Sequence, residues 1–349
     1  ASTIERSSAE FGKVDSSCSS ATGGSNVGGL IGAVYESSTI TESYADVEVL
    51  SNYASTGGLI GGITNALVEV SESYALGSVI SSKQNTGGLI GHLGGQNIIE
   101  NSFSSNGVTS SNASYLGGLI GVAHNTNTFN DSYYDKDRSG RTDTGKGLGR
   151  TTKQLIETLQ ANGKIDNENS YTNWDETIWD FGNACEYPRL RWQPYDPLAV
   201  TCVRFSGNND NVTDNNSVHT YTDIQIAFNR SVDNSTLDNN TVSLSPSVNI
   251  HAAIYDNSSR TYTLTPAGPL DNNTTYTLTL SSGIKDADGN SFVEESRSFY
   301  TLYNATLGNV GTVWNFTNAT ATGRSGPIQA QIDSAYSSTN LAGAVTINT

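Results

Sequence analysis

Apolar and polar residues alternate in short runs over the first 150 residues, and these runs recur at a nearly constant distance. The string Gly-Gly-Leu-Ile-Gly begins at residues 28, 57, 87 and 117, at spacings of 29, 30 and 30 residues. Alternating stretches such as Leu67–Ser71 and Gly77–Ile80 lie between the strings. Alternation at period two predicts short strands, and the Gly and Asn residues between them predict corners.

A second marker runs in phase with the first. It reads Ser-Tyr-Ala at residues 43–45 and 73–75, Ser-Phe-Ser at 102–104 and Ser-Tyr-Tyr at 132–134. A looser Gly-x-Val pattern follows it, and Ser8–Val14 is a degenerate first copy. A repeat of about 30 residues cannot bury its own apolar face, whereas stacked copies can. The pattern therefore predicts a β-solenoid.

Stacking predicts that like side chains form ladders inside the solenoid. The first ladders come from the Leu-Ile pairs: Leu30, Ile31, Leu59, Ile60, Leu89, Ile90, Leu119 and Ile120. A further interior ladder is expected from the aromatic residues Tyr44, Tyr74, Phe103 and Tyr133. The paired glycines allow close backbone approach or a positive φ at a corner.

The glycine core and the two markers that follow it resemble the GLUG repeat, which is found in bacterial surface and adhesin-like proteins. The resemblance covers roughly residues 8–150. It implies a cell-surface repeat module and no catalytic residues.

After the last copy the pattern changes, and we expect four parts. Residues 1–150 form the solenoid, 151–199 a cap and junction, 200–301 a sandwich, and 302–349 a tail. Leu155, Ile156 and Leu159 predict a helix over 152–160. Because the last coil of a solenoid exposes an apolar face, this helix together with Trp174 and Trp179 is expected to cover that end.

Residues 200–301 carry short strand patterns separated by turn signals at sandwich-like spacing. The expected strands are Thr222–Phe228, Thr241–Ser245, Asn249–Tyr255, Thr261–Pro266, Thr275–Ser281 and Arg297–Thr301. The runs IQIAFNRSVDNSTL and YTLTPAGPLDNNTTYTLTLSSGIKDADGNSF resemble bacterial Ig-like domains of the S-layer type. That resemblance implies a spacer or stalk in a surface protein, in some cases with calcium in its loops. The fold class is therefore all-β.

The tail, 302–349, holds two further strand patterns, Val310–Phe316 and Ala344–Thr349. Its sequence resembles the opening of a glycine-rich extracellular domain. An unpaired strand there can add to the sheet of a neighbouring molecule, which is the basis of a self-assembly hypothesis.

The charge balance excludes some classes of partner. The net charge is −16, and only three basic residues precede residue 130. Nucleic-acid binding needs clustered cations, so neither nucleic acid nor an anionic membrane surface is an expected partner. No run of 18 apolar residues exists, so we expect no membrane insertion. The chain begins Ala-Ser-Thr and contains no Met, which favours a processed mature end or a fragment of an extracellular or cell-surface protein.

Cysteines and sequons add two open questions. Cys185 and Cys202 flank the junction and are candidates for a disulfide, with two free thiols as the alternative. Cys18 is left over. Thirteen Asn-x-Ser/Thr sequons permit glycosylation, although a chain of this composition would hold about ten by chance.

Two oxygen-rich turns are candidates for calcium, the single cofactor considered. Their ligands would be Asp135, Asp137 and Ser139 in one turn, and Asp286, Asp288 and Asn290 in the other. The first lacks the Glu that an EF-hand loop places at position twelve. The alternative for both is an Asx turn, in which the side chain bonds its own backbone.

Other chemical motifs are weaker. Asp143-Thr144-Gly145 matches half of an aspartic-protease site, which needs two such carboxylates. Residues 140–146 fit the start of a phosphate loop, but Gly147 replaces the required Ser or Thr. Glu42, Glu72 and Glu100 nearly repeat in phase, which suggests either a solvent-facing row or the carboxylates of a carbohydrate-active face. The four His residues show no metal spacing.

Three hypotheses follow from the sequence. The first is a non-enzymatic structural or adhesive surface module whose partners are other surface proteins or glycans. The second is a filament subunit that polymerises with its own kind through the tail. The third is a solenoid that binds or cleaves carbohydrate.

Overall fold

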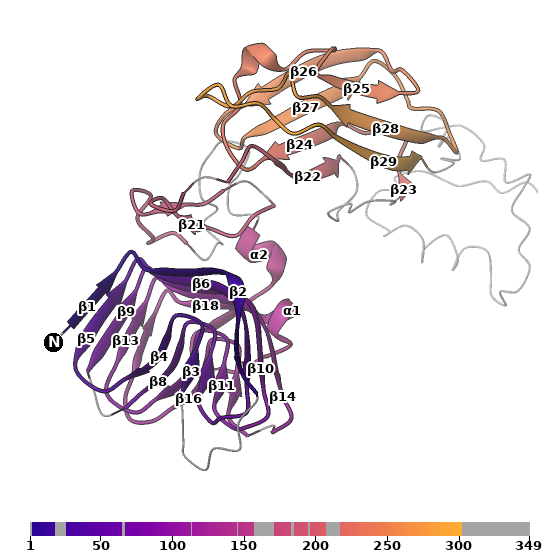
Figure 1. The fold of residues 1–349 in the computed structure, drawn as a ribbon. Coiled ribbons are helices and arrows are strands. Elements are labelled where there is room, and N and C mark those ends of the chain that lie inside the picture. The colour runs from indigo at the N-terminus through magenta and orange to yellow at the C-terminus, as the bar shows by residue number, and fades with distance from the viewer. Residues whose placement is uncertain are drawn as a thin grey trace, which may run out of the picture.

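The computed structural model describes residues 2–17, 26–64, 67–112, 114–144, 146–156, 171–182, 185–194, 196–206 and 217–301. It contains a parallel β-solenoid and an antiparallel β-sandwich, joined by a segment with few regular elements (Figure 1). The predicted all-β fold class, a solenoid followed by an Ig-like sandwich, is confirmed. The two tail strands and Cys18 lie outside the described residues.

Each solenoid coil contributes one strand to each of four parallel sheets. The first coil holds β1 (Ser2–Glu5), β2 (Ser8–Ser16), β3 (Val27–Gly28) and β4 (Ile31–Val34). The second holds β5 (Ser38–Thr41), β6 (Tyr44–Ser51), β7 (Thr56–Gly57) and β8 (Ile60–Ile63). The third holds β9 (Val68–Ser71), β10 (Tyr74–Ser81), β11 (Thr86–Gly87) and β12 (Ile90–Leu93).

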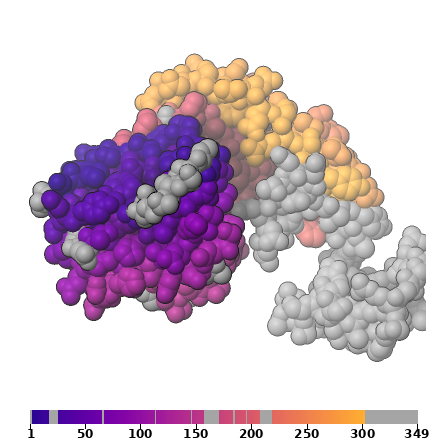
Figure 2. Space-filling model, turned by 60° about the horizontal axis from the view of Figure 1, so that its bottom comes forward, coloured from indigo at the N-terminus to yellow at the C-terminus, as the bar shows by residue number. Residues whose placement is uncertain are grey.

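The fourth coil holds β13 (Ile98–Glu100), β14 (Phe103–Ser110), β15 (Leu116–Gly117) and β16 (Ile120–Ala123). The last coil is partial, with β17 (Thr128–Asn130), β18 (Tyr133–Asp135) and β19 (Leu148–Arg150), and with helices α1 (Lys136–Ser139) and α2 (Thr152–Ile156) beside it. The coils appear as successive bands from indigo to magenta in Figure 2.

A repeated corner sets the register of this stack. The residue before each Ser-aromatic marker has a left-handed backbone, with φ between 40° and 48° at Arg6, Glu42, Glu72, Asn101 and Asp131. We call these five residues the arch row. Non-glycine residues rarely adopt this conformation, so its recurrence in five coils shows that the stack itself imposes the turn.

The serine that follows each arch residue forms hydrogen bonds between successive coils. Ser43, Ser73, Ser102 and Ser132 are fully or almost fully buried. Each hydroxyl donates to the carbonyl oxygen two residues earlier, at 2.7–2.8 Å. It also accepts the backbone N–H of the matching serine in the preceding coil, at 3.2–3.4 Å. Both hydrogen-bonding roles of a buried hydroxyl are thereby satisfied, as burial requires.

The Leu-Ile pairs lie in the solenoid interior. Leu59, Leu89 and Leu119 and the isoleucines that follow them are all fully buried in one continuous core. Leu30 and Ile31 are half-buried against the same core. They belong to the first coil, whose strands pair on one side only in the described part of the chain.

The aromatic ladder differs from its prediction, because the four rings do not point inward. In β6 the interior receives Ala45, Val47 and Val49, whereas Tyr44 belongs to a separate cluster. Side chains alternate between the two faces of a strand, so a residue next to Ala45 faces outward. Tyr44, Tyr74, Phe103 and Tyr133, which we call the aromatic row, are nevertheless buried.

The end of the last complete coil, the fourth, is closed by Tyr134 and by polar side chains that follow α1. Tyr134 is buried in the solenoid core, and its hydroxyl donates to the Asp143 carbonyl oxygen at 2.7 Å. The Asp143 carboxylate accepts the Gly118 N–H at 3.0 Å. The Lys146 ammonium donates to the Gly121 and Leu116 carbonyl oxygens, and burial lowers its pKa. The protease-like and phosphate-loop-like motifs thus supply polar caps for terminal backbone groups.

The sandwich consists of two antiparallel sheets, apart from one parallel pair. One sheet has the order β22 (Val200–Phe205), β24 (Ile224–Phe228), β27 (Thr261–Pro266) and β26 (Ile250–Asp256). The other has the order β23 (Ser217–Val218), β29 (Glu295–Thr301), β28 (Thr275–Leu280) and β25 (Val242–Ser245), and β23 runs parallel to β29. The short helix η1 (Asn234–Thr236) precedes β25. The six predicted strands are present within two residues of their expected ends, whereas β22 and β23 were missed.

The close approach of successive coils gives a first prediction. A Cβ at Gly88 would lie 2.1 Å from the Gly118 carbonyl oxygen and 2.2 Å from Ser104 Oγ. We expect Gly88→Ala to lower the free energy of unfolding by about 3 kcal/mol, because backbone atoms of the next coil would have to move. At Gly107 the nearest atom to such a Cβ is 3.8 Å away, so Gly107→Ala should stay within about 0.5 kcal/mol. Urea unfolding of both variants measures the two changes in unfolding free energy. Equal losses in Gly88→Ala and Gly107→Ala would contradict the close approach of successive coils at Gly88.

Candidate functional site

One segment covers the aromatic row from outside. Residues 171–182 and 185–193, which we call the flank cover, include the short strands β20 (Trp179–Asp180) and β21 (Arg189–Leu190). The segment lies beside the sheet that contains β6 and β18 (Figure 1). Its buried residues Tyr171, Trp174, Trp179, Phe181 and Leu190 share one cluster with the aromatic row. The predicted tryptophan cap is therefore a cover along the flank, in contact with several coils, and not a plug at the end.

The rings of the aromatic row and the flank cover form a continuous stack. Tyr44 and Tyr74 lie 5.0 Å apart at an interplanar angle of 9°, and Tyr74 and Phe103 lie 5.0 Å apart at 14°. Trp179 packs against both Tyr74 and Phe103, at ring distances of 5.9 and 6.0 Å. Trp174 reaches Tyr133 at 6.2 Å. Such pairs add stability beyond the area that they bury.

Three indole N–H groups attach the flank cover to three different coils. Trp174 donates to the Asp131 carbonyl oxygen at 3.0 Å, and Trp192 donates to the Glu42 carbonyl oxygen at 2.9 Å. Trp179 donates to the Glu72 carboxylate. All three acceptors belong to the arch row. Burial raises the pKa of Glu72, although the hydrogen bonds from Asn101 and Trp179 oppose this rise.

The strand register shows whether Glu42, Glu72 and Glu100 occupy equivalent positions in successive coils. Glu42 and Glu72 occupy the same position in neighbouring coils, but Glu100 pairs with Ser71 and so lies one position earlier. The in-phase residue is Asn101, whose amide donates to Glu72 at 2.7 Å. Glu42 accepts from Arg6 at 2.9 Å. The three glutamates therefore do not form one row, and two of them bind neighbouring residues of the solenoid.

The flank cover is joined to the sandwich by a disulfide and a buried ion pair. Cys185 and Cys202 form a disulfide, with their Cα atoms 6.1 Å apart. Asp180 accepts two hydrogen bonds from the Arg260 guanidinium, both at 2.7 Å. Burial alone would raise the pKa of Asp180, but the charge and hydrogen bonds of Arg260 outweigh it and hold that pKa below its ordinary value.

Glu186 lies in the same charged cluster, and burial raises its pKa to about 7. The positive charges of Arg260 and Arg189 oppose this rise, while Asp180 and Asp196 add to it. A carboxyl group of this kind stays protonated well above the usual range of glutamate.

The first calcium candidate is occupied by contacts within the chain. Asp135 is fully buried and caps α1 by accepting the backbone N–H of Asp137 and Arg138 at 2.9 and 3.0 Å. Its other oxygen accepts from Thr152 and Tyr187. The third candidate ligand of this turn, Ser139, accepts the backbone N–H of Arg141 at 3.3 Å.

The second turn is similar. Asp286 accepts the backbone N–H groups of Asp288 and Asn290 at 2.9 and 2.8 Å, and the Asn290 amide at 2.9 Å. Arg230 lies 3.1 Å from Asp286 and 2.7 Å from Asp288. These contacts support the Asx-turn alternative, and calcium in either turn stays a prediction. Among the described residues, no three His, Cys, Asp or Glu side chains are grouped to hold a metal ion.

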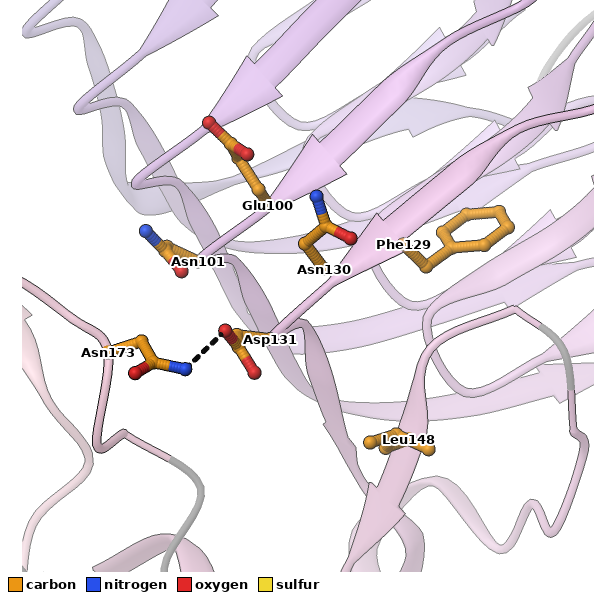
Figure 3. Close-up of a pocket in the computed structure, with 7 residues that line it drawn as sticks. All are labelled: Glu100, Asn101, Phe129, Asn130, Asp131, Leu148 and Asn173. Atoms are coloured by element: carbon orange, nitrogen blue, oxygen red, sulfur yellow. Dashed lines mark hydrogen bonds between the residues drawn. The ribbon is translucent and has the colours of Figure 1, made fainter.

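A shallow polar hollow lies where the flank cover meets the last coils (Figure 3). It is lined by Glu100, Asn101, Phe129, Asn130, Asp131, Leu148 and Asn173. Asn173 reaches across from the flank cover and donates to Asp131 at 2.9 Å. Of the three glutamates considered for a carbohydrate-active face, this hollow contains Glu100 alone, and the carbohydrate hypothesis stays a prediction.

Comparison with known proteins finds a family model that matches part of the chain. Residues 208–318 match the family model of the bacterial Ig-like domain Big_5, which confirms the Ig-like interpretation of the sandwich. Among solved structures, the surface layer protein SbsC, domains 1-6, is 21% identical with a TM-score of 0.24. That match covers 31% of this chain and 14% of SbsC, and so it carries no structural argument. No curated protein matches the chain. The GLUG resemblance stays a prediction.

The expectation that the chain does not insert into a membrane can be compared only with the helices of the described residues. Within those parts of the chain, no helix combines the length and the hydropathy that a bilayer span requires.

The hydrogen bond from Trp179 to Glu72 predicts a cost for losing the indole N–H. Trp179→Phe would remove one of two donors to the half-buried Glu72 carboxylate, the other being the Asn101 amide, and would open a small cavity. We expect a loss of about 3 kcal/mol in unfolding free energy. Trp192→Phe is the matched control, because its acceptor is a carbonyl oxygen and the ring is only half-buried; about 1 kcal/mol is expected. Adding Glu72→Gln to Trp179→Phe should recover part of the loss. Independent, additive costs in guanidinium unfolding would contradict this coupling.

The raised pKa of Glu186 predicts a pH dependence of stability. An unfolded glutamate has a pKa of about 4.3, so the folded state binds more protons between about pH 4.5 and pH 7. Stability from this group is therefore complete below about pH 4.5 and is lost as the pH rises through 7. The unfolding free energy should fall by about 3 kcal/mol over that range relative to Glu186→Gln, which cannot ionise, because one pKa unit corresponds to about 1.4 kcal/mol. Parallel pH profiles of the two proteins would contradict the assignment.

Proposed function

We propose that this chain is a non-enzymatic structural module of an extracellular surface, in which an Ig-like domain carries a stiff solenoid as a spacer. A spacer must hold its parts in one orientation. The observation that carries the proposal is the continuous set of buried contacts from the coils, through the flank cover, to the sandwich. The aromatic row, the three indole bonds, the Asp180–Arg260 pair and the disulfide are its successive links.

The polar chemistry of the chain supports the same proposal. Side chains that suggested a reaction in the sequence are engaged in holding backbone or neighbouring side chains. Asp143 and Lys146 cap the last coil, and Glu42 and Glu72 bind Arg6 and Trp179. The match of residues 208–318 to a bacterial Ig-like domain supports a bacterial surface location. Adhesion to other surface proteins or glycans, and polymerisation through the tail, are finer forms of the proposal.

The proposal requires that solenoid and sandwich keep one orientation in solution. Spin labels at Ser111→Cys in the fourth coil and Glu294→Cys in the sandwich, both exposed sites, would report this in a Cys18→Ser background. We expect one narrow distance distribution by pulsed electron resonance. Arg260→Ala combined with Cys185→Ser and Cys202→Ser should broaden it at least twofold, because both links at the junction are then lost.

Arg6→Ala is the matched control, since the Arg6 side chain is 58% exposed and its ion pair with Glu42 joins the first two coils and not the flank cover to the sandwich. Exposed ion pairs contribute little, so the distribution should not change. A broad distribution in the unmodified protein would refute the spacer proposal.

A further inference from the structure

Two of the four histidines lie together on the outside of the solenoid, although 31 residues separate them in the sequence. His92 is on β12 and is half-buried, and His124 follows β16 in the next coil and is exposed. In the stack Leu93 pairs with Ala123, and the His124 N–H donates to the Leu93 carbonyl oxygen at 2.8 Å. The two ring centres are 5.3 Å apart, with an interplanar angle of 59°.

We propose that His92 and His124 form a two-histidine site for a divalent transition metal ion such as zinc, nickel or copper. Imidazole nitrogens are preferred ligands of these ions, whereas calcium and magnesium prefer oxygen. Metal–nitrogen bonds to imidazole are about 2.0–2.1 Å long. Two imidazoles on one tetrahedral ion therefore have ring centres about 5 Å apart, which is close to the observed separation.

The environment of His92 prepares its ring for this role. It is half-buried on the solenoid wall, beside the exposed His124 of the next coil. Burial, and then the proximity of His124, lower the pKa of His92. A metal ion binds the neutral form of an imidazole.

The solvent side of the pair leaves space for the rest of a coordination shell. On the other side, the Asn26 side chain covers Gly62, which is the register partner of His92 in the neighbouring coil. The exposure of His124 leaves one side of the pair open to solvent. Since no third His, Cys, Asp or Glu joins the pair among the described residues, water completes the shell. The net charge of −16 also raises the local concentration of cations.

Calorimetric titration of nickel chloride into the full chain, with Cys18→Ser to remove the remaining thiol, tests the site. We expect one nickel ion per chain. His92→Ala and His124→Ala should each weaken binding at least about tenfold. The matched control is the double variant His219→Ala and His251→Ala, which changes the two histidines of the sandwich and should bind as the parent does. Parental affinity in both single variants, or loss in the control, would overturn the proposal.

A second measurement does not depend on how the alanine variants fold. The unaltered chain has four histidines, so its imidazole proton signals are few and can be assigned with His92→Gln and His124→Gln. Substoichiometric copper should broaden the signals of His92 and His124 and spare the other two. Broadening confined to His219 or His251, or equal broadening of all four, would place the metal elsewhere and overturn the site.

Discussion

The structure depends on the register between successive coils, and a buried serine in each coil fixes that register. Ser73 accepts the N–H of Ser43 while donating to the Ser71 carbonyl oxygen, and each neighbouring coil repeats the arrangement. A slip of one residue between coils would break the bond from Ser43 and leave its buried N–H without that acceptor, at about 1–3 kcal/mol per coil. It would also turn every strand over, because side chains alternate between faces. Four such coils make the register cooperative.

This register has a consequence on the outside of the solenoid. Because identical positions stack, any apolar residue that faces outward becomes a continuous stripe, and Tyr44, Tyr74 and Phe103 are such a stripe. An exposed stripe of this size is an aggregation risk. The flank cover buries it with rings and places its indole N–H groups on the arch row, where the turns bring acceptors to the surface. The same segment carries the disulfide and the ion pair to the sandwich. The flank cover therefore both buries the aromatic stripe and joins the solenoid to the sandwich.

Much of the fold could be predicted from local patterns, and what was missed is nonlocal. Five identical residues at a 30-residue period indicate stacking, and alternation indicates the strands. The face of the aromatic row could also be predicted, because side chains alternate along a strand and Ala45, Val47 and Val49 must lie on the face opposite to Tyr44. The size of the aromatic ring favours the opposite assignment, to the core. The serine of the second marker was visible as a repeat, yet its small polar side chain gave no reason to assign it a structural role. The partners of Trp179 and Asp180 lie 107 and 80 residues away, and no local pattern indicates them.

The polar motifs show why short sequence matches are ambiguous. Asp143, Lys146 and Asp135 each lie within or beside a string that is typical of a catalytic or cation-binding loop. A solenoid end presents unpaired N–H and C=O groups, and so does the first turn of a helix. Carboxylates and ammonium groups satisfy these backbone groups with the same oxygen and nitrogen atoms that would bind a metal or a phosphate. A motif of this kind is informative only once its backbone partners are known. In the described part of this chain those partners are present, and the charged side chains stabilise the solenoid end, the helix terminus and the flank that a stiff spacer requires.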